Sequence, residues 1–282
     1  TVLALGFFAA CGSLAEGVAS RAVPLGEQLF EGAMPYVKLS LHGEFIRRMV
    51  DGTLPAAAFE FYLRQDNLYL SKYARAFALL AARADQTDEF EWLLNSSIDM
   101  LHEHGKKANI DVDEKTFERE ASPTTRAYTS FFMQASWGEG NVLGYSSLLA
   151  CQRLYDWLFS EVKATMPIAD DNPYKKYIEQ YADPTNHQVT VIMEGFLERY
   201  AAQGLREETL ARAQYHFNTA MQYEAQFFQQ GLDHCAAVGC DAPPSGEFAA
   251  LGGRLAMRVE SDGPSEQRRR TQEQAPVAAA SG

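Results

Sequence analysis

The sequence is poor in positive charge and in cysteine. Its 25 Lys and Arg residues are outnumbered by 37 Asp and Glu residues, which gives a net charge of −12. A nucleic-acid-binding protein needs basic surface against phosphate, so this balance argues against that class. The four cysteines are too few and too scattered for a disulfide scaffold: Cys11, Cys151, Cys235 and Cys240. No run reaches the roughly 20 apolar residues that cross a bilayer. We therefore expect a soluble, acidic protein from a reducing compartment, without nucleic-acid or membrane partners.

Recognised motifs for metals, nucleotides and serine nucleophiles are also missing. The chain has no phosphate-binding glycine loop and no G-x-S-x-G nucleophile elbow. His102 and His104 stand two residues apart, so in a helix their imidazoles point away from each other. Cys235, Cys240 and the neighbouring His234 lack the second cysteine pair of a zinc site. We predict no metal site and no cofactor.

Apolar residues recur at helical spacing between Leu25 and Gly231, without alternation typical of strands. The three clearest stripes fall in residues 55–80, 141–163 and 207–230. Their members are Phe59, Tyr62, Leu63, Tyr69, Leu70, Tyr73 and Phe77; then Leu148, Leu154, Tyr155, Leu158 and Phe159; then Leu210, Phe217, Met221 and Phe228.

Capping residues followed by proline mark the starts of three helices: Ser122-Pro123, Asn172-Pro173 and Asp183-Pro184. Glycines mark breaks at residues 51–53, at residues 138–140 and at Gly204. The pattern predicts about eight helices in a single all-α bundle.

The two ends differ in composition from the middle. Residues 1–24 form an apolar N-terminal segment, which we interpret either as the remnant of a targeting peptide or as a short packing helix. Residues 241–282 are rich in Pro and Gly and include Arg268–Arg270, so we predict a disordered tail. The folded domain is then expected to span residues 25–240.

Three polar or reactive residues interrupt the apolar stripes. Asp66 lies between Tyr62 and Tyr69, Glu224 continues the stripe of the late helix, and Cys151 stands one turn before Tyr155. A buried carboxylate is costly unless it is paired, so each acid either joins a structural polar network or belongs to a site. A buried cysteine is either a small apolar side chain or a nucleophile whose pKa a neighbour has tuned. His187 and His216 are isolated, and we interpret them as surface or capping residues.

Tyrosines are unusually frequent on these stripes. The chain has 13, and each buried hydroxyl needs a hydrogen-bond partner, which a core built only for packing avoids. Inward tyrosines suit a pocket for a flat, polar, nitrogen-rich ring. They also suit a polar core, and the sequence leaves both interpretations open.

Five segments in order resemble the TenA family. They are DGTLPAAAFEFYLRQDNLYLSKYARAF (51–77), SPTTRAYTSFF (122–132), LLACQRLYDWLF (148–159), NPYKKYIEQYAD (172–183) and MQYEAQFF (221–228). The resemblance covers roughly residues 27–231 and implies a haem-oxygenase-like all-α fold. It also implies thiaminase II or aminopyrimidine aminohydrolase activity, a thiamin or aminopyrimidine substrate, and assembly as a homo-oligomer, commonly a tetramer.

The resemblance also implies roles for individual residues. Cys151 would be the nucleophile and Glu224 the acid that protonates a pyrimidine nitrogen. Asp66 would hydrogen-bond the aminopyrimidine edge and help position the thiol. The remaining residues would contact the ring or complete the polar lining: Tyr69, Tyr128, Tyr155, Tyr181 and Phe227.

Two other functions remain as alternatives. The same fold could serve a haem or di-iron oxidase, for which we find no inward His and carboxylate ligands at helical spacing. It could also form a non-catalytic pyrimidine-binding module, against which the cysteine argues. Around that cysteine the chain has Ala150, Gln152 and Arg153, where relatives commonly carry proline and bulky aromatics. We expect a cytoplasmic protein, or one targeted to an organelle or secreted if residues 1–24 are a targeting segment.

Overall fold

The computed structural model describes the backbone of residues 23–108 and 113–240, and within these ranges all regular structure is helical. Ten helices follow one another in the described residues, two more than predicted, and three of them have only seven residues. They are α1 (Leu25–Leu41), α2 (Glu44–Val50), α3 (Ala56–Ala81), α4 (Thr87–Ala108), α5 (Glu114–Glu120), α6 (Pro123–Gly138), α7 (Asn141–Thr165), α8 (Lys175–Tyr181), α9 (Pro184–Ala201) and α10 (Glu207–Val238). The predicted tail, residues 241–282, and most of the apolar N-terminal segment lie outside the described residues.

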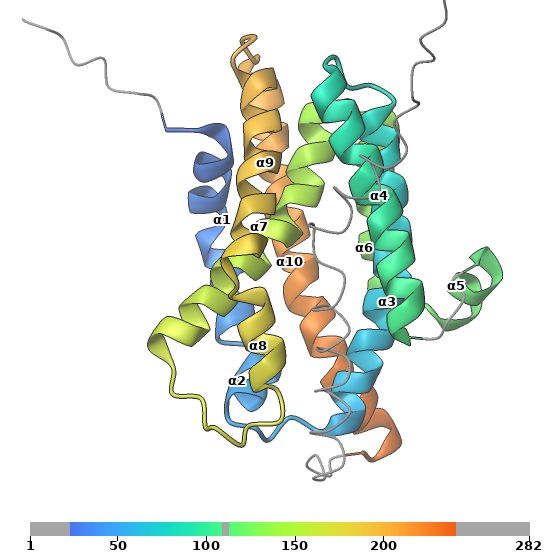
Figure 1. Ribbon diagram of the computed structural model, residues 1–282, viewed down its shortest axis with the longest axis vertical. Coiled ribbons are helices and arrows are strands. Elements are labelled where there is room, and N and C mark those ends of the chain that lie inside the picture. Colours follow the sequence, from blue (N-terminus) through green and yellow to red (C-terminus); the bar gives the residue numbers. More distant parts are fainter. Residues whose placement is uncertain (1–22, 109–112, 241–282) are drawn as a thin grey trace, which may run out of the picture.

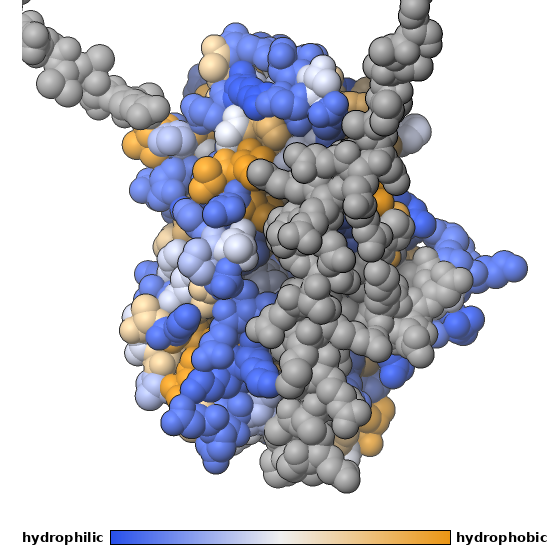
Figure 2. All heavy atoms as spheres, viewed as in Figure 1, coloured by the Kyte–Doolittle hydropathy of each residue, from blue (hydrophilic) through white to orange (hydrophobic). Residues whose placement is uncertain are grey.

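The helices α7 and α10 form the centre of the bundle. Figure 1 shows α1 and α9 on one side of this pair and α3, α4 and α6 on the other. Helix α10 packs against α1, α3, α6 and α7, and α8 packs on the second half of α7. Among the described helices, none combines the length and apolarity that a membrane crossing requires. The visible face in Figure 2 is mainly hydrophilic, with small apolar patches.

Two of the three predicted helix starts are confirmed. The Ser122 hydroxyl accepts a hydrogen bond from the Thr125 N–H at 3.0 Å, and the Asp183 carboxylate accepts one from the Thr185 N–H at 2.8 Å. The start predicted at Asn172-Pro173 is wrong, because α8 begins at Lys175. The Asn172 side chain instead donates to the carbonyls that end α2 and accepts from the Tyr174 N–H. The predicted breaks at residues 51–53 and at Gly204 fall between helices, and the break at residues 138–140 begins at Gly138, the last residue of α6.

Most members of the apolar stripes are buried, Leu63 and Leu70 are half-buried, and one member is exposed. The aromatic residues of the α3 stripe are all buried, and so are the five stripe residues of α7. Leu210 is 38% exposed, which contradicts its predicted place in the core. It lies in the first turn of α10, before the buried residues of that helix begin at Ala213.

Helices α10 and α3 pack closely against each other beside the core. A Cβ built on Gly231 would lie 2.6 Å from the carbonyl oxygen of Ala58, so no larger residue fits without moving the backbone. Helix α10 ends at Val238, and the next residue, Gly239, has a left-handed φ of 75°. A disulfide joins Cys235 to Cys240 at this end of the helix. Sequence reasoning considered these two cysteines only as an incomplete zinc site and missed their pairing.

Candidate active site around Cys151

Five helices supply the residues that were predicted to form a site. Helix α7 carries Cys151 and Tyr155, and α10 carries Glu224 and Phe227. Helix α3 carries Asp66 and Tyr69, α6 carries Tyr128, and α8 carries Tyr181. The structure brings all eight side chains together, since each interacts with Cys151, with Glu224 or with a residue that does.

The carboxyl group of Glu224 is the most deeply enclosed acid of this group. Only 2% of the residue is exposed, and the Tyr128 hydroxyl donates a hydrogen bond of 2.7 Å to its Oε1 atom. Burial raises the pKa of Glu224 to about 7, against the hydrogen bonds from Tyr128 and Cys151, which lower it. The negative charge of Asp66 adds to the increase. At neutral pH this carboxyl group can therefore both give and take a proton.

Cys151 is the free cysteine of the described residues. It keeps some accessible surface, although its neighbours Ala150 and Leu154 are fully buried. Burial raises the pKa of its thiol well above the ordinary value, and the nearby Glu224 charge raises it further. The Tyr69 hydroxyl opposes this by favouring the thiolate. Cys151 is therefore protonated at neutral pH, and becomes a nucleophile only when its proton is taken up.

Aromatic rings form a wall beside the thiol, with Tyr69 at its centre. The Tyr69 ring lies 5.1 Å from that of Tyr128 and 5.5 Å from that of Phe227, measured between centroids. Its hydroxyl is enclosed and makes no well-aligned hydrogen bond to another described residue. By contrast, the Tyr73 hydroxyl on the next turn is held by the Leu148 carbonyl at 2.9 Å. The Tyr69 hydroxyl therefore faces the Cys151 thiol and the Tyr128 hydroxyl rather than a backbone carbonyl.

A second group of tyrosines lies on the α8 side of the thiol. The ring of Tyr181 lies 5.1 Å from that of Tyr155. Burial raises the pKa of Tyr181 above its ordinary value, and the nearby Asp66 charge raises it further. The Tyr155 hydroxyl is hydrogen-bonded to that of Tyr62, which also contacts the Tyr177 hydroxyl at 3.0 Å. Sequence reasoning did not include Tyr62 or Tyr177 in the site. The available signals were the place of Tyr62 on the α3 stripe and the spacing of Tyr177 one turn before Tyr181.

The two isolated histidines differ in their surroundings. The side chain of His187 is 58% exposed and pairs with Asp156 at 2.9 Å, as expected of a surface residue. His216 is buried, so its interpretation as a surface or capping residue is wrong. Its ring contacts the Ser147 hydroxyl at 3.1 Å and the Glu139 carboxylate at 3.2 Å, and burial lowers its pKa. These contacts join α10 to α7 two turns before Glu224.

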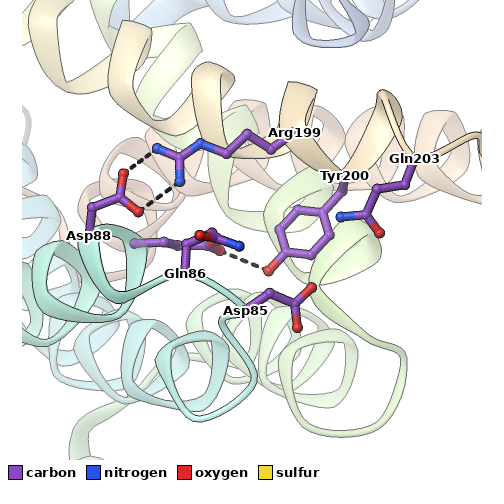
Figure 3. Close-up of a pocket in the computed structure, with 7 residues that line it drawn as sticks. Asp85, Gln86, Asp88, Arg199, Tyr200 and Gln203 are labelled. Atoms are coloured by element: carbon purple, nitrogen blue, oxygen red, sulfur yellow. Dashed lines mark hydrogen bonds and ion pairs between the residues drawn. The ribbon is translucent and has the colours of Figure 1, made fainter.

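A separate polar pocket lies between the start of α4 and the end of α9. It has a volume of about 360 Å³ and is lined by Asp85, Gln86, Asp88, Glu89, Arg199, Tyr200 and Gln203 (Figure 3). The charged side chains that line this pocket are largely paired with one another or hydrogen-bonded to tyrosines. Arg199 forms a two-bond pair with Asp88, and Glu89 accepts hydrogen bonds from Tyr200 at 3.0 Å and Tyr145 at 2.8 Å. The pocket contains none of the predicted site residues.

His102 and His104 are rejected as metal ligands on their spacing in the sequence. The side chains of His102 and His104 lie outside the described residues. Where side chains are described, no group of three or more His, Cys, Asp and Glu residues could hold a metal ion.

Comparison with known sequences places these residues in a wider context. Residues 33–234 match the TENA/THI-4/PQQC family. The chain is 30% identical over 213 residues to an uncharacterized protein of Haemophilus influenzae, covering 73% of this chain and 98% of that protein. It is 27% identical over 216 residues to the aminopyrimidine aminohydrolase of Halalkalibacterium halodurans, covering 73% of this chain and 94% of that protein.

Solved structures share the fold. A TenA homologue from P. horikoshii superposes with a TM-score of 0.64 at 20% identity, covering 75% of this chain and 99% of that one. A domain with a haem-oxygenase-like fold from Shewanella denitrificans gives a TM-score of 0.54 at 13% identity, covering 79% and 97%. The predicted all-α, haem-oxygenase-like bundle is therefore confirmed.

Proposed function

Since this chain belongs to the TENA/THI-4/PQQC family, we propose that it is a cysteine-dependent hydrolase of thiamin or thiamin-derived aminopyrimidines. The product would be a hydroxymethylpyrimidine, available for salvage. One observation carries the proposal: a protonated thiol and a carboxyl group with a pKa near neutrality interact directly inside a tyrosine-lined site. The aminopyrimidine aminohydrolase of Halalkalibacterium halodurans, 27% identical to this chain, supports the reaction class.

Cys151 and Glu224 would divide the displacement into two easier steps. The Cys151 sulfur forms a bond to a ring carbon, and Glu224 gives its proton to the ring nitrogen that receives the electron pair. The thiol proton goes to the leaving amine, whose bond to the exocyclic methylene breaks. Water then adds to the methylene. The carbon–sulfur bond breaks, the ring nitrogen returns its proton to Glu224, and the water proton restores the thiol.

The surrounding groups would hold the substrate for this reaction. Asp66, half-buried beside the thiol, would accept a hydrogen bond from the amino group of the pyrimidine. The rings of Tyr69 and Phe227 would contact the flat pyrimidine, while Tyr128 fixes Glu224. Tyr155 and Tyr181 would complete the polar lining on the α8 side. A small substrate held in this way reacts as if it were present at a very high local concentration.

Ammonia release from 4-amino-5-aminomethyl-2-methylpyrimidine tests the proposal. The wild-type protein should release ammonia, and Cys151→Ser should abolish the release while still binding the pyrimidine in calorimetry. Circular dichroism and thermal unfolding of Cys151→Ser control for folding. Full activity in Cys151→Ser, or no turnover by the wild-type protein, would refute the proposal. Tight binding by wild type without product would instead identify a non-catalytic pyrimidine-binding module.

A further inference from the structure

Tyr62 is a fully buried tyrosine in the middle of the bundle. Its ring packs against Phe45 at 5.1 Å and against Phe228 at 5.7 Å, contacts that a phenylalanine would make equally well. Burial raises the pKa of its hydroxyl well above the ordinary value, so the group stays neutral. A buried hydroxyl adds nothing to packing and needs partners, so its presence calls for a reason beyond the core.

The partners of this hydroxyl are two other tyrosine hydroxyls, from two other helices. One belongs to Tyr155, one turn after Cys151 on α7. The other belongs to Tyr177, 3.0 Å away on α8 and one turn before Tyr181. The Tyr62 hydroxyl therefore joins α3, α7 and α8 at one point, and its partner on α7 stands one helical turn after Cys151.

Helix α8 depends on such contacts because it is short. It has seven residues, and a helix of that length is not stable alone. Its start is anchored by the Tyr174 hydroxyl, which donates to the Leu54 carbonyl at 2.6 Å, and its end by the Asn186 amide, which donates to the Tyr181 carbonyl at 3.0 Å. The Tyr62–Tyr177 contact holds the middle of the helix, on the side that faces the site.

We propose that Tyr62 is a positioning residue, whose hydroxyl fixes Tyr155 and Tyr177 and thereby orients Tyr155 and Tyr181 toward Cys151. The inference rests on the proposed function, since it assigns Tyr155 and Tyr181 to the substrate lining. Tyr62 acts only through these residues. The Cys151–Glu224 pair itself does not depend on it, so losing the hydroxyl should affect substrate binding more than the chemical step.

The test compares Tyr62→Phe with Tyr174→Phe. Both variants lose one hydroxyl from a fully buried tyrosine, and the second loses it at the start of α8, away from the thiol. For Tyr62→Phe we expect KM for the aminopyrimidine to rise about tenfold with little change in kcat, as for one hydrogen bond of ordinary strength. Tyr174→Phe should leave KM unchanged even where it lowers the melting temperature.

A second measurement does not need turnover. Iodoacetamide labelling of Cys151, followed on its own peptide by mass spectrometry, reports how well α8 covers the thiol. Tyr62→Phe should speed the labelling several-fold, whereas Tyr174→Phe should not. Tyr177→Phe removes the same hydroxyl contact from its other side, so the double variant should be little worse than Tyr62→Phe alone.

The outcomes separate the two proposals. Unchanged KM and labelling in Tyr62→Phe, or full additivity with Tyr177→Phe, would overturn the positioning role while wild-type turnover still upheld the hydrolase. Wild type without turnover, combined with faster labelling in Tyr62→Phe, would overturn the hydrolase and leave the positioning of α8 standing.

Discussion

Replacing Glu224 with glutamine should remove the contribution of this residue to the pH dependence of the protein's stability. The pKa of Glu224 is raised from 4.5 to about 7, so the folded protein favours the protonated carboxyl group. The stability that this provides is complete below pH 4.5 and is lost as the pH rises through about 7. The separation between the two pKa values corresponds to about 3 kcal/mol.

Glutamine keeps an oxygen that can accept the Tyr128 hydrogen bond, but it never becomes charged. Glu224→Gln should therefore gain stability relative to wild type as the pH rises. Between about pH 5 and about pH 8 the gain should amount to roughly 2–3 kcal/mol, since part of the difference already exists at the lower pH. The side chain is 2% exposed, so solvent screening reduces this value little.

Urea unfolding at both pH values, with wild type and variant at one protein concentration, measures this difference. Glu44→Gln serves as a control, because Arg47 lowers the pKa of that exposed carboxyl group and the effect there has the opposite sign. If the stability difference between wild type and Glu224→Gln is the same at both pH values, the carboxyl group is not held protonated by burial, and the reasoning fails.

Three further predictions concern the site and its frame. Proposed hydrolase activity should fall above about pH 7 as Glu224 loses its proton, and Tyr128→Phe should move this limit to higher pH, because it removes a hydrogen bond that lowers the pKa; pH–rate profiles check both. Gly231→Ala should cost about 2 kcal/mol through the clash with Ala58, whereas Gly195→Ala, which faces open space, should be neutral or slightly stabilising in urea unfolding. Arg153→Met should cost about 2 kcal/mol, measured in the same way, because it leaves Glu194 without its partner; an unchanged midpoint would contradict this.

Local chemistry made part of the fold predictable. Ser122 and Asp183 cap the helices that follow them through bonds to residues two or three positions away, so a short stretch of sequence contains the whole interaction. Asn172 carries the same signal, but its side chain is bound to carbonyls of Met49 and Val50, more than 120 residues earlier. Nothing in the sequence around Asn172 indicates that these distant carbonyls bind its side chain in place of a helix N-terminus.

The same difference between local and long-range interactions decides which residues of the site could be predicted from the sequence. Cys151, Glu224 and Asp66 could be predicted as candidate site residues because each interrupts an apolar stripe on its own helix. The burial of His216 could not be predicted in this way, because it depends on contacts with Ser147 and Glu139 from other parts of the chain. Tyr62 fitted its stripe as an aromatic residue, and only the position of Tyr177, 115 residues away, reveals the use of its hydroxyl.

The raised pKa values at the centre of the site explain how a reactive pair can be kept inside a stable bundle. Burying an ionised thiolate beside an ionised carboxylate would place two like charges in a poorly solvated space. Below about pH 7 both groups are mainly protonated, so Cys151 and Glu224 are buried as neutral hydrogen-bonding groups at little cost. In that pH range the charge would develop mainly when a substrate is present whose ring nitrogen can take the Glu224 proton. Reactivity would therefore depend on a bound ring that accepts a proton, and this dependence would give the proposed hydrolase a means of selecting pyrimidines over other thiol-reactive molecules.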